Sequence, residues 1–157
     1  MRIRVISIGK TNMSFVKAGI DEYLSRLQRY IKVSWEELPD VKNGGKLDHM
    51  ALKEKECELI FSKVTKYDTL VLLDEGGQQY SSVDFSKWLE KQMLHLNGDL
   101  CFIIGGAYGF SERVYAETSY KISLSQMTFS HQIIRAIFAE QLYRAFTIQR
   151  GEPYHHA

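Results

Sequence analysis

Residues 100–109 read Leu100-Cys101-Phe102-Ile103-Ile104-Gly105-Gly106-Ala107-Tyr108-Gly109, an unbroken apolar run followed by a glycine cluster. A continuous apolar run of this length is typical of a strand that is covered on both faces, as in a parallel sheet. A second such run, Thr69-Leu70-Val71-Leu72-Leu73, ends in the polar segment Asp74-Glu75-Gly76-Gly77, which we interpret as a turn. In open parallel sheets, ligands bind beyond the carboxyl ends of the strands. We therefore expect a binding site where these two runs end.

Extended and helical patterns alternate through the rest of the chain. Further strands, rich in β-branched residues or alternating between apolar and polar ones, are predicted at residues 2–8, 33–38 and 120–124. Apolar residues recur at helical spacing in segments 14–31, 49–64, one after Ser81 or Ser82, a short one from Ser111, and 130–148. Strands separated by helices indicate an α/β fold, a parallel sheet flanked by helices. No linker or repeat interrupts the pattern, so we expect one domain over residues 1–157.

The charge balance gives little support to nucleic-acid binding. The formal net charge is only +1, whereas proteins that hold RNA chiefly by neutralising phosphates usually carry a clear basic excess. Cys57 and Cys101 have no metal-ligand spacing, and reduced thiols suit the cytosol. No stretch has the length and hydrophobicity of a membrane span, and the N-terminus has no signal-peptide pattern. We expect a cytoplasmic protein without membrane or metal partners.

The segment Ser125-Gln126-Met127-Thr128-Phe129-Ser130-His131-Gln132 follows the last predicted strand. Its backbone groups could hydrogen-bond the edge of a purine, while Met127 and Leu73 lie against the faces of the base. Met127 and Phe129 could equally pack in the core, which is the commoner fate of such residues. The glycine cluster lets a ligand approach the backbone, but it has neither GxGxxG nor P-loop spacing and alone indicates only a tight turn.

The long C-terminal helix is apolar nearly all round, which indicates burial on more than one side. A subunit interface is one way to cover the second side. Within this helix, His131 and Arg135 are four residues apart and share a face, and so do Glu140 and Arg144. The latter two residues could form an ion pair.

The tail after this helix contains Arg150, Glu152, Tyr154 and His155 within six residues. Terminal residues are ordinarily frayed, so this density of charged, aromatic and imidazole groups is unusual. Tyrosine and arginine together can stack on an unpaired base and hold a phosphate, as in single-stranded RNA recognition.

Five motifs along the chain, taken together, point to a known family. They are Ile8-Gly9-Lys10, Ile103-Ile104-Gly105-Gly106-x-x-Gly109, Leu124-Ser125-x-Met127-Thr128-Phe129-x-His131-Gln132, Glu140-Gln141-Leu142-Tyr143-Arg144-Ala145 and Gly151-Glu152-Pro153-Tyr154-His155. In order and spacing the chain resembles the ribosomal RNA large subunit methyltransferase H family of SPOUT-class enzymes, from the first strand to the tail. The resemblance implies a SPOUT-type α/β fold with a C-terminal trefoil knot, and a homodimer. It also implies S-adenosylmethionine-dependent methylation of N3 of a pseudouridine in 23S rRNA, on assembled ribosomes.

The resemblance further implies roles for individual residues. S-adenosylmethionine would contact Leu73, Gly105, Leu124, Ser125, Gln126, Met127, Thr128 and Phe129. His131, Tyr154 and His155 are candidates to accept the N3 proton, with the tail acting in its own protomer or in the partner. Arg135 and Arg144 would hold a phosphate or an exocyclic oxygen, and Arg150 would also contact RNA. Ser130 replaces a proline common in the family, and its hydroxyl could cap the helix instead.

Three alternatives remain. The chain could be a non-catalytic, ribosome-associated RNA-binding protein that retains the fold, or a SPOUT methyltransferase that acts on tRNA. A nucleotide-dependent phosphotransfer domain ranks last, because the glycine cluster at residues 105–109 has no lysine and no nearby metal-binding carboxylate.

Overall fold

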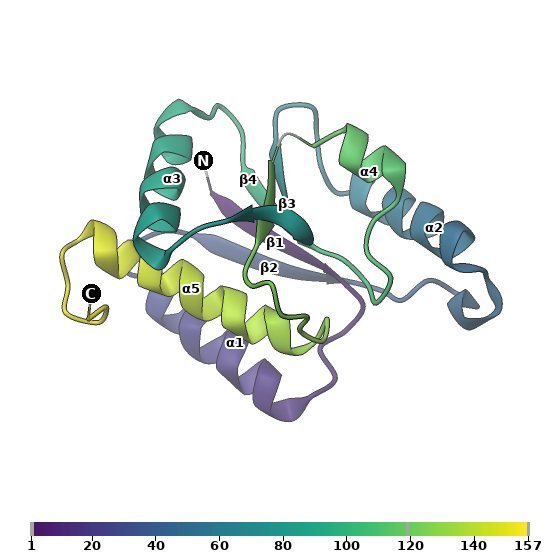
Figure 1. Ribbon diagram of the computed structural model, residues 1–157, viewed down its shortest axis with the longest axis horizontal. Coiled ribbons are helices and arrows are strands. Elements are labelled where there is room, and N and C mark those ends of the chain that lie inside the picture. The colour runs from purple at the N-terminus through teal and green to yellow at the C-terminus, as the bar shows by residue number, and fades with distance from the viewer. Residues whose placement is uncertain (1, 119, 157) are drawn as a thin grey trace.

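The computed structural model describes residues 2–118 and 120–156 (Figure 1). Within them, five strands form one sheet in the order β2-β1-β4-β3-β5, and every neighbouring pair is parallel. The strands are β1 (Ile3–Ile8), β2 (Val33–Leu38), β3 (Thr69–Gln79), β4 (Leu100–Ile104) and β5 (Tyr120–Ser123). The helices are α1 (Ser14–Leu27), α2 (His49–Phe61), α3 (Ser82–His95), α4 (Glu112–Ala116) and α5 (Ile133–Gln149), with a 3-10 turn at Gly44–Lys46. The predicted parallel α/β fold is confirmed.

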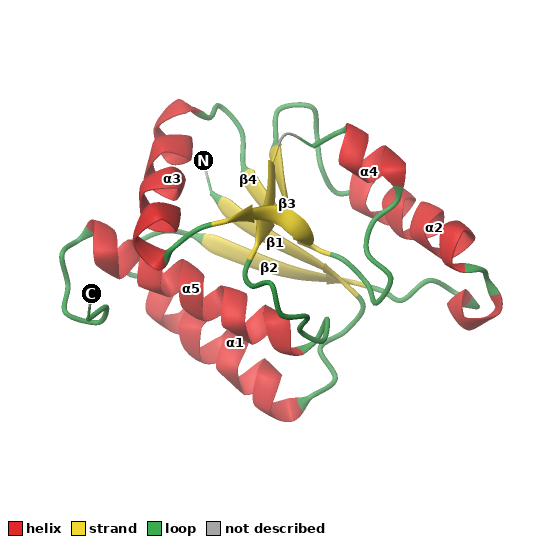
Figure 2. Ribbon diagram, in the orientation of Figure 1, coloured by secondary structure: helices red, strands yellow, loops and turns green. Residues whose placement is uncertain are grey.

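Helices cover both faces of the sheet: α1, α3 and α5 lie on one side, and α2 and α4 on the other (Figure 2). All residues of β4 are buried, as predicted for a strand covered on both faces. Phe102 and Ile104 join the core beneath α3 and α5, while Cys101 and Ile103 join the core beneath α2 and α4. No helix among the described residues is long and apolar enough to cross a membrane.

The apolar character of α5 is explained in large part within the protomer. The helix packs against both α1 and α3, and Phe138, Leu142 and Phe146 reach the core above the sheet. Its start is capped as predicted, because the Ser130 Oγ accepts a hydrogen bond from the backbone N–H of Ile133 at 3.0 Å. The hydroxyl satisfies one of the N–H groups that a helix start leaves without an intrahelical partner.

The segment Asp74-Glu75-Gly76-Gly77 is not the turn that the sequence suggested, because β3 continues through it to Gln79. β3 pairs with β5 twice, first with Leu73 opposite Ile122 and then, after a register shift, with Gln78 opposite the same Ile122. β3 therefore bends across β5 (Figure 1). A Cβ at Gly77 would lie 2.6 Å from the backbone nitrogen of Ile122, so the crossing leaves no room for a side chain.

We expect Gly77→Ala to lower the free energy of unfolding by at least about 3 kcal/mol, because the added methyl group collides with backbone that cannot move aside. Gly76→Ala is the matched control: a Cβ there meets Asp74 Oδ2 only at 3.8 Å, so its effect should stay within about 1 kcal/mol. Chemical denaturation of both variants measures the difference. Equal stability of the two variants would show that the crossing is not tight.

Candidate functional site

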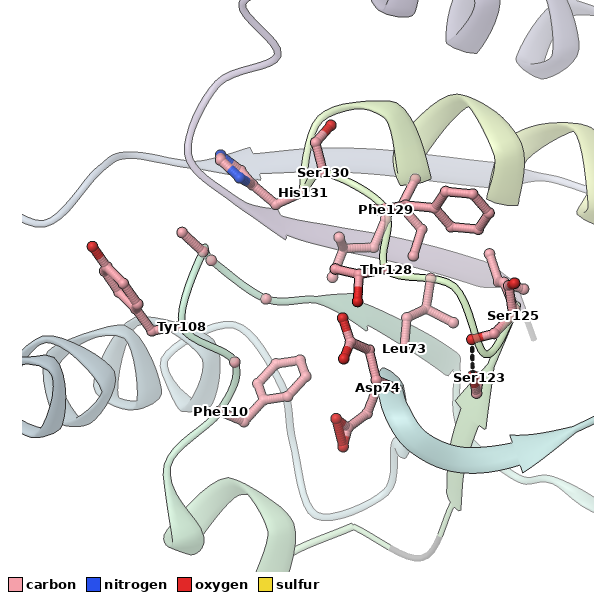
Figure 3. A pocket seen from close by; sticks show the side chains of 18 of the residues that line it. Leu73, Asp74, Tyr108, Phe110, Ser123, Ser125, Thr128, Phe129, Ser130 and His131 are labelled. Carbon is pink, nitrogen blue, oxygen red and sulfur yellow. Dashed lines mark hydrogen bonds between the residues drawn. The ribbon is translucent and has the colours of Figure 1, made fainter.

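The middle of β3, where it begins to cross β5, and the carboxyl ends of β4 and β5 enclose a cavity of about 620 Å³ (Figure 3). This volume falls in the range of roughly 300–1,000 Å³ that is usual for small-molecule sites. Of the residues predicted to bind the cofactor, all but Gln126 line the cavity: Leu73, Gly105, Leu124, Ser125, Met127, Thr128 and Phe129. His131 also lines it. The strand ends that the sequence singled out thus meet at one place.

The cavity combines apolar walls with an open edge. Leu73, Ile104 and Phe110 form a buried base, and Met127 is 76% exposed at the rim. Phe110 was not predicted as a site residue, although it directly follows the glycine cluster. The arrangement suits a ligand with one apolar portion and one portion that faces solvent.

The loop after β5 is shaped by its own serines. The Ser123 hydroxyl donates to the Ser125 carbonyl at 2.8 Å, and the Ser125 Oγ accepts from the Met127 N–H at 2.9 Å (Figure 3). Within the described residues, no hydrogen bond engages the backbone N–H or C=O of Thr128 or Phe129. Because backbone polar groups near a cavity require partners, these groups can serve a ligand.

The glycine cluster packs closely against the protein itself. A Cβ at Gly105 would lie 3.0 Å from the Phe110 ring, and one at Gly106 would lie 2.6 Å from the Glu56 carboxylate. Burial, and to a lesser degree Asp40, raises the pKa of Glu56 to about 7. Gly109 has a φ of +81°, which glycine adopts without strain. Protein packing and backbone conformation therefore explain why glycine occupies these positions, without any ligand.

Acidic residues line one side of the cavity and were absent from the predicted site. Asp74 and Glu75 follow Leu73 directly, so their position at a strand end was the available signal. Burial and the neighbouring Asp74 carboxylate raise the pKa of Tyr115, which also lines the cavity. Among the described residues, no group of three or more His, Cys, Asp or Glu side chains is placed to hold a metal ion.

Arg135 does not occupy the position expected of a phosphate ligand. Its side chain is fully buried, with no exposed surface. The guanidinium donates to the carbonyls of Ile8, Gly9 and His131 at 2.7–3.0 Å and to the Thr11 hydroxyl at 2.9 Å. Four of its five N–H donors are thereby used, and burial lowers its pKa. Arg135 links the start of α5 to the end of β1, and a contact of its guanidinium with substrate stays a prediction.

Gln132, close to Arg135 in the chain, forms further hydrogen bonds to the β1–α1 loop. Its side-chain oxygen accepts from the Asn12 N–H at 2.8 Å, and its side-chain nitrogen donates to the Lys10 carbonyl at 3.0 Å. This role was not predictable from local sequence patterns, because the partners lie about 120 residues away. The segment that carries His131 is thus fixed to the β1–α1 loop.

The tail packs on its own protomer. Arg144 donates through Nε to Glu140 at 2.9 Å, as the predicted ion pair requires, and its NH1 lies 2.9 Å from His155 Nδ1. Tyr154 donates to the same Glu140 at 3.0 Å and contacts the face of the Arg144 guanidinium. Burial and hydrogen bonding raise the pKa of Tyr154. In this arrangement the Tyr154 phenol is a hydrogen-bond donor rather than a proton acceptor.

The cavity lies at the start of α5, and the tail folds back along the helix from its other end. Tyr154 donates to Glu140, seven residues after Ile133, where the helix begins, which corresponds to about 10 Å at 1.5 Å per residue. None of Arg144, Arg150, Tyr154 and His155 lines the cavity. Arg150 is exposed, with its guanidinium 5.2 Å from the centre of the Tyr30 ring. A single protomer therefore does not bring His131 together with the tail.

Comparison with known proteins identifies the class. A family model described as "Predicted SPOUT methyltransferase" matches residues 1–155. Proteins named ribosomal RNA large subunit methyltransferase H are similar over 99% of this chain and 99% of their own length. They include those of Flavobacterium johnsoniae (53% identical), Flavobacterium psychrophilum (54%) and Parabacteroides distasonis (52%). The chain belongs to the SPOUT methyltransferase family and, within it, to the ribosomal RNA large subunit methyltransferase H group, which confirms the resemblance.

We expect Arg135→Lys to lower the free energy of unfolding by about 2–4 kcal/mol, because an ammonium group cannot reproduce the planar fork of buried donors. Arg26→Lys is the control, since Arg26 forms an exposed i,i+4 pair with Glu22, and it should leave the free energy of unfolding nearly unchanged. Thermal or chemical unfolding measures both. An Arg135→Lys protein of normal stability but weaker rRNA binding would support the substrate role.

Proposed function

We propose that this protein uses S-adenosylmethionine to methylate N3 of a pseudouridine in 23S rRNA, in the cytoplasm and on assembled ribosomes. The observation that carries the proposal is the cavity at the middle of β3 and the carboxyl ends of β4 and β5 in a chain of this family. The names of the relatives support a large-subunit rRNA substrate. The whole chain would act as one methyltransferase domain.

The cavity fits the proposed cofactor chemically. Leu73, Met127 and Phe129 offer apolar contacts for an adenosine, and the backbone of Thr128 and Phe129 offers hydrogen-bonding groups. Half-buried Asp74 suits a cationic ligand. When bound, S-adenosylmethionine supplies a methyl group already activated by its sulfonium, so the protein requires no covalent nucleophile. The remaining tasks are to orient the nucleobase and to accept its N3 proton.

Residues of two protomers would share these tasks. His131 lies exposed at the cavity and is the proposed proton acceptor. Tyr154 and His155, fixed by Glu140 and Arg144, would hold the base from the partner's side. Because no described residue of the tail lines the cavity of its own protomer, the tail would serve the partner's cavity. Arg150 is the exposed candidate for phosphate contact.

Exposed apolar side chains support a homodimer. They are Met13 and Phe15 at the start of α1, Ile133 at the start of α5 and Met127 in the loop before it, and Phe15 is 63% exposed. The starts of α1 and α5 are joined by the hydrogen bond between Asn12 and Gln132. Burial of such side chains in a subunit contact would remove apolar surface from water.

The crossing of β3 over β5 supports a C-terminal trefoil knot. β5 pairs with β3 on both sides of the register shift, so the chain that leaves β5 departs from beneath an arch formed by residues 73–79. It then continues through the 124–132 loop into α5. Passage of this segment through the arch would make the knot that the resemblance implies.

Mass spectrometry of 23S rRNA nucleosides tests the proposed function. Cells that lack the gene should lose N3-methylpseudouridine, and the wild-type protein should restore it. An unchanged 23S rRNA with a missing methyl group in tRNA would support the tRNA alternative. Failure of the purified protein to bind S-adenosylmethionine by calorimetry would support a non-catalytic binding protein.

The net charge of +1 predicts weaker binding to a free RNA stem-loop than to ribosomes. Gel shifts measure both affinities, and equal affinity for the two would contradict this expectation.

Mixed dimers test the proposed sharing of residues. Dimers in which both subunits carry His131→Ala, or both carry Tyr154→Ala, should fold and bind cofactor but lose about 100-fold or more in turnover. A heterodimer of the two variants retains one intact site if the tail acts in the partner, so it should recover about half of the wild-type activity. Action of the tail within its own protomer would leave the heterodimer inactive. Near wild-type turnover of both homodimeric variants would contradict the assignment of His131 and Tyr154 to the active site.

A further inference from the structure

The described side chains that line the cavity include carboxylates but no lysine or arginine. Asp74 and Glu75 supply the carboxylates. His131, just before the start of α5, also lines the cavity. Neither Asp74 nor Glu75 forms an ion pair with a described residue. The unliganded cavity therefore holds uncompensated negative charge.

The two carboxylates differ in their surroundings. Asp74 is half-buried and follows Leu73, whose side chain forms part of the cavity base. Figure 3 shows Asp74 between Thr128 and Phe110, within the cavity. Glu75, the next residue, is exposed to solvent. Because water and salt screen exposed charges far more than sheltered ones, Asp74 exerts the stronger field on a bound ligand.

We propose that Asp74 makes this cavity select the cationic methyl donor over the neutral thioether product. The inference rests on the proposed function, in which the donor is S-adenosylmethionine. When the methyl group is transferred to N3, the bonding electron pair stays on sulfur and the N3 proton leaves. The product S-adenosylhomocysteine thus keeps the adenosine and amino-acid groups and loses only the methyl group and the positive charge. A sheltered carboxylate attracts the donor more strongly than the product, and it favours exchange of product for fresh donor.

Calorimetric titration of the dimer with three probes tests this role. The probes are S-adenosylmethionine, S-adenosylhomocysteine and sinefungin, which carries a protonated amine in place of the sulfonium. Asp74→Asn keeps the size and polarity of the side chain and removes its charge. We expect this variant to raise the dissociation constants of both cationic probes by about tenfold or more, and that of the neutral probe by less than about threefold.

Glu117→Gln is the matched control, because it removes an exposed carboxylate that does not line the cavity. It should change all three affinities by less than about threefold. If Asp74→Asn lowers the affinity for all three probes by the same factor, the proposal is overturned, since Asp74 would then act on the adenosine or amino-acid groups that the probes share. Unchanged binding of all three would overturn it as well. Asp74→Ser provides a second uncharged side chain if thermal unfolding shows that the Asn variant is misfolded.

Failure of the proposed function gives a different result from failure of this inference. If the wild-type dimer binds none of the three probes, the cofactor assignment itself is wrong. If the wild type binds all three and the Asp74→Asn variant keeps the same preference for the cations, only the role of Asp74 is wrong.

Discussion

The arrangement of the candidate site depends on the backbone crossing in which β3 bends over β5. A Cβ at Gly77 would lie 2.6 Å from the backbone of Ile122, so the two strands meet without an intervening side chain. The crossing sets the end of β5 against Leu73 and places the 124–129 loop beside the glycine cluster. Three segments that are distant in sequence thereby form one cavity.

Two buried side chains fix the far end of the same loop. Arg135 and Gln132 bind the backbone that follows β1, so the chain from β5 to α5 is held at both ends by the sheet. A ligand loop that is anchored at both ends loses little conformational freedom when it binds. The cavity rim, by contrast, is formed by Met127, which is largely exposed. The protein thus combines a fixed base with an accessible entrance.

The sequence predicted those parts that depend on local pattern. The buried strand at residues 100–104, the parallel order, the Ser130 cap and the convergence of three strand ends all follow from periodicity or from chain direction. The extension of β3 was not predictable, because Asp74-Glu75-Gly76-Gly77 has turn composition and only its contact with β5 makes it a strand. The burial of Arg135 was not predictable for a similar reason: its i,i+4 relation to His131 is local, whereas its other partners, Ile8, Gly9 and Thr11, lie at and after the end of β1. The separation of the tail from the cavity likewise depends on the length of α5 and on packing.

The central claim is that this cavity holds S-adenosylmethionine and that a second protomer completes it. A crystal structure of the full-length protein grown with S-adenosylmethionine or S-adenosylhomocysteine tests both parts together. We expect ligand density against Leu73, Gly105 and residues 124–129, with Tyr154 and His155 of the other subunit at the entrance. A cavity that stays empty at saturating ligand would refute cofactor binding at this site, and tails that point away from it in both subunits would refute the role of the second protomer.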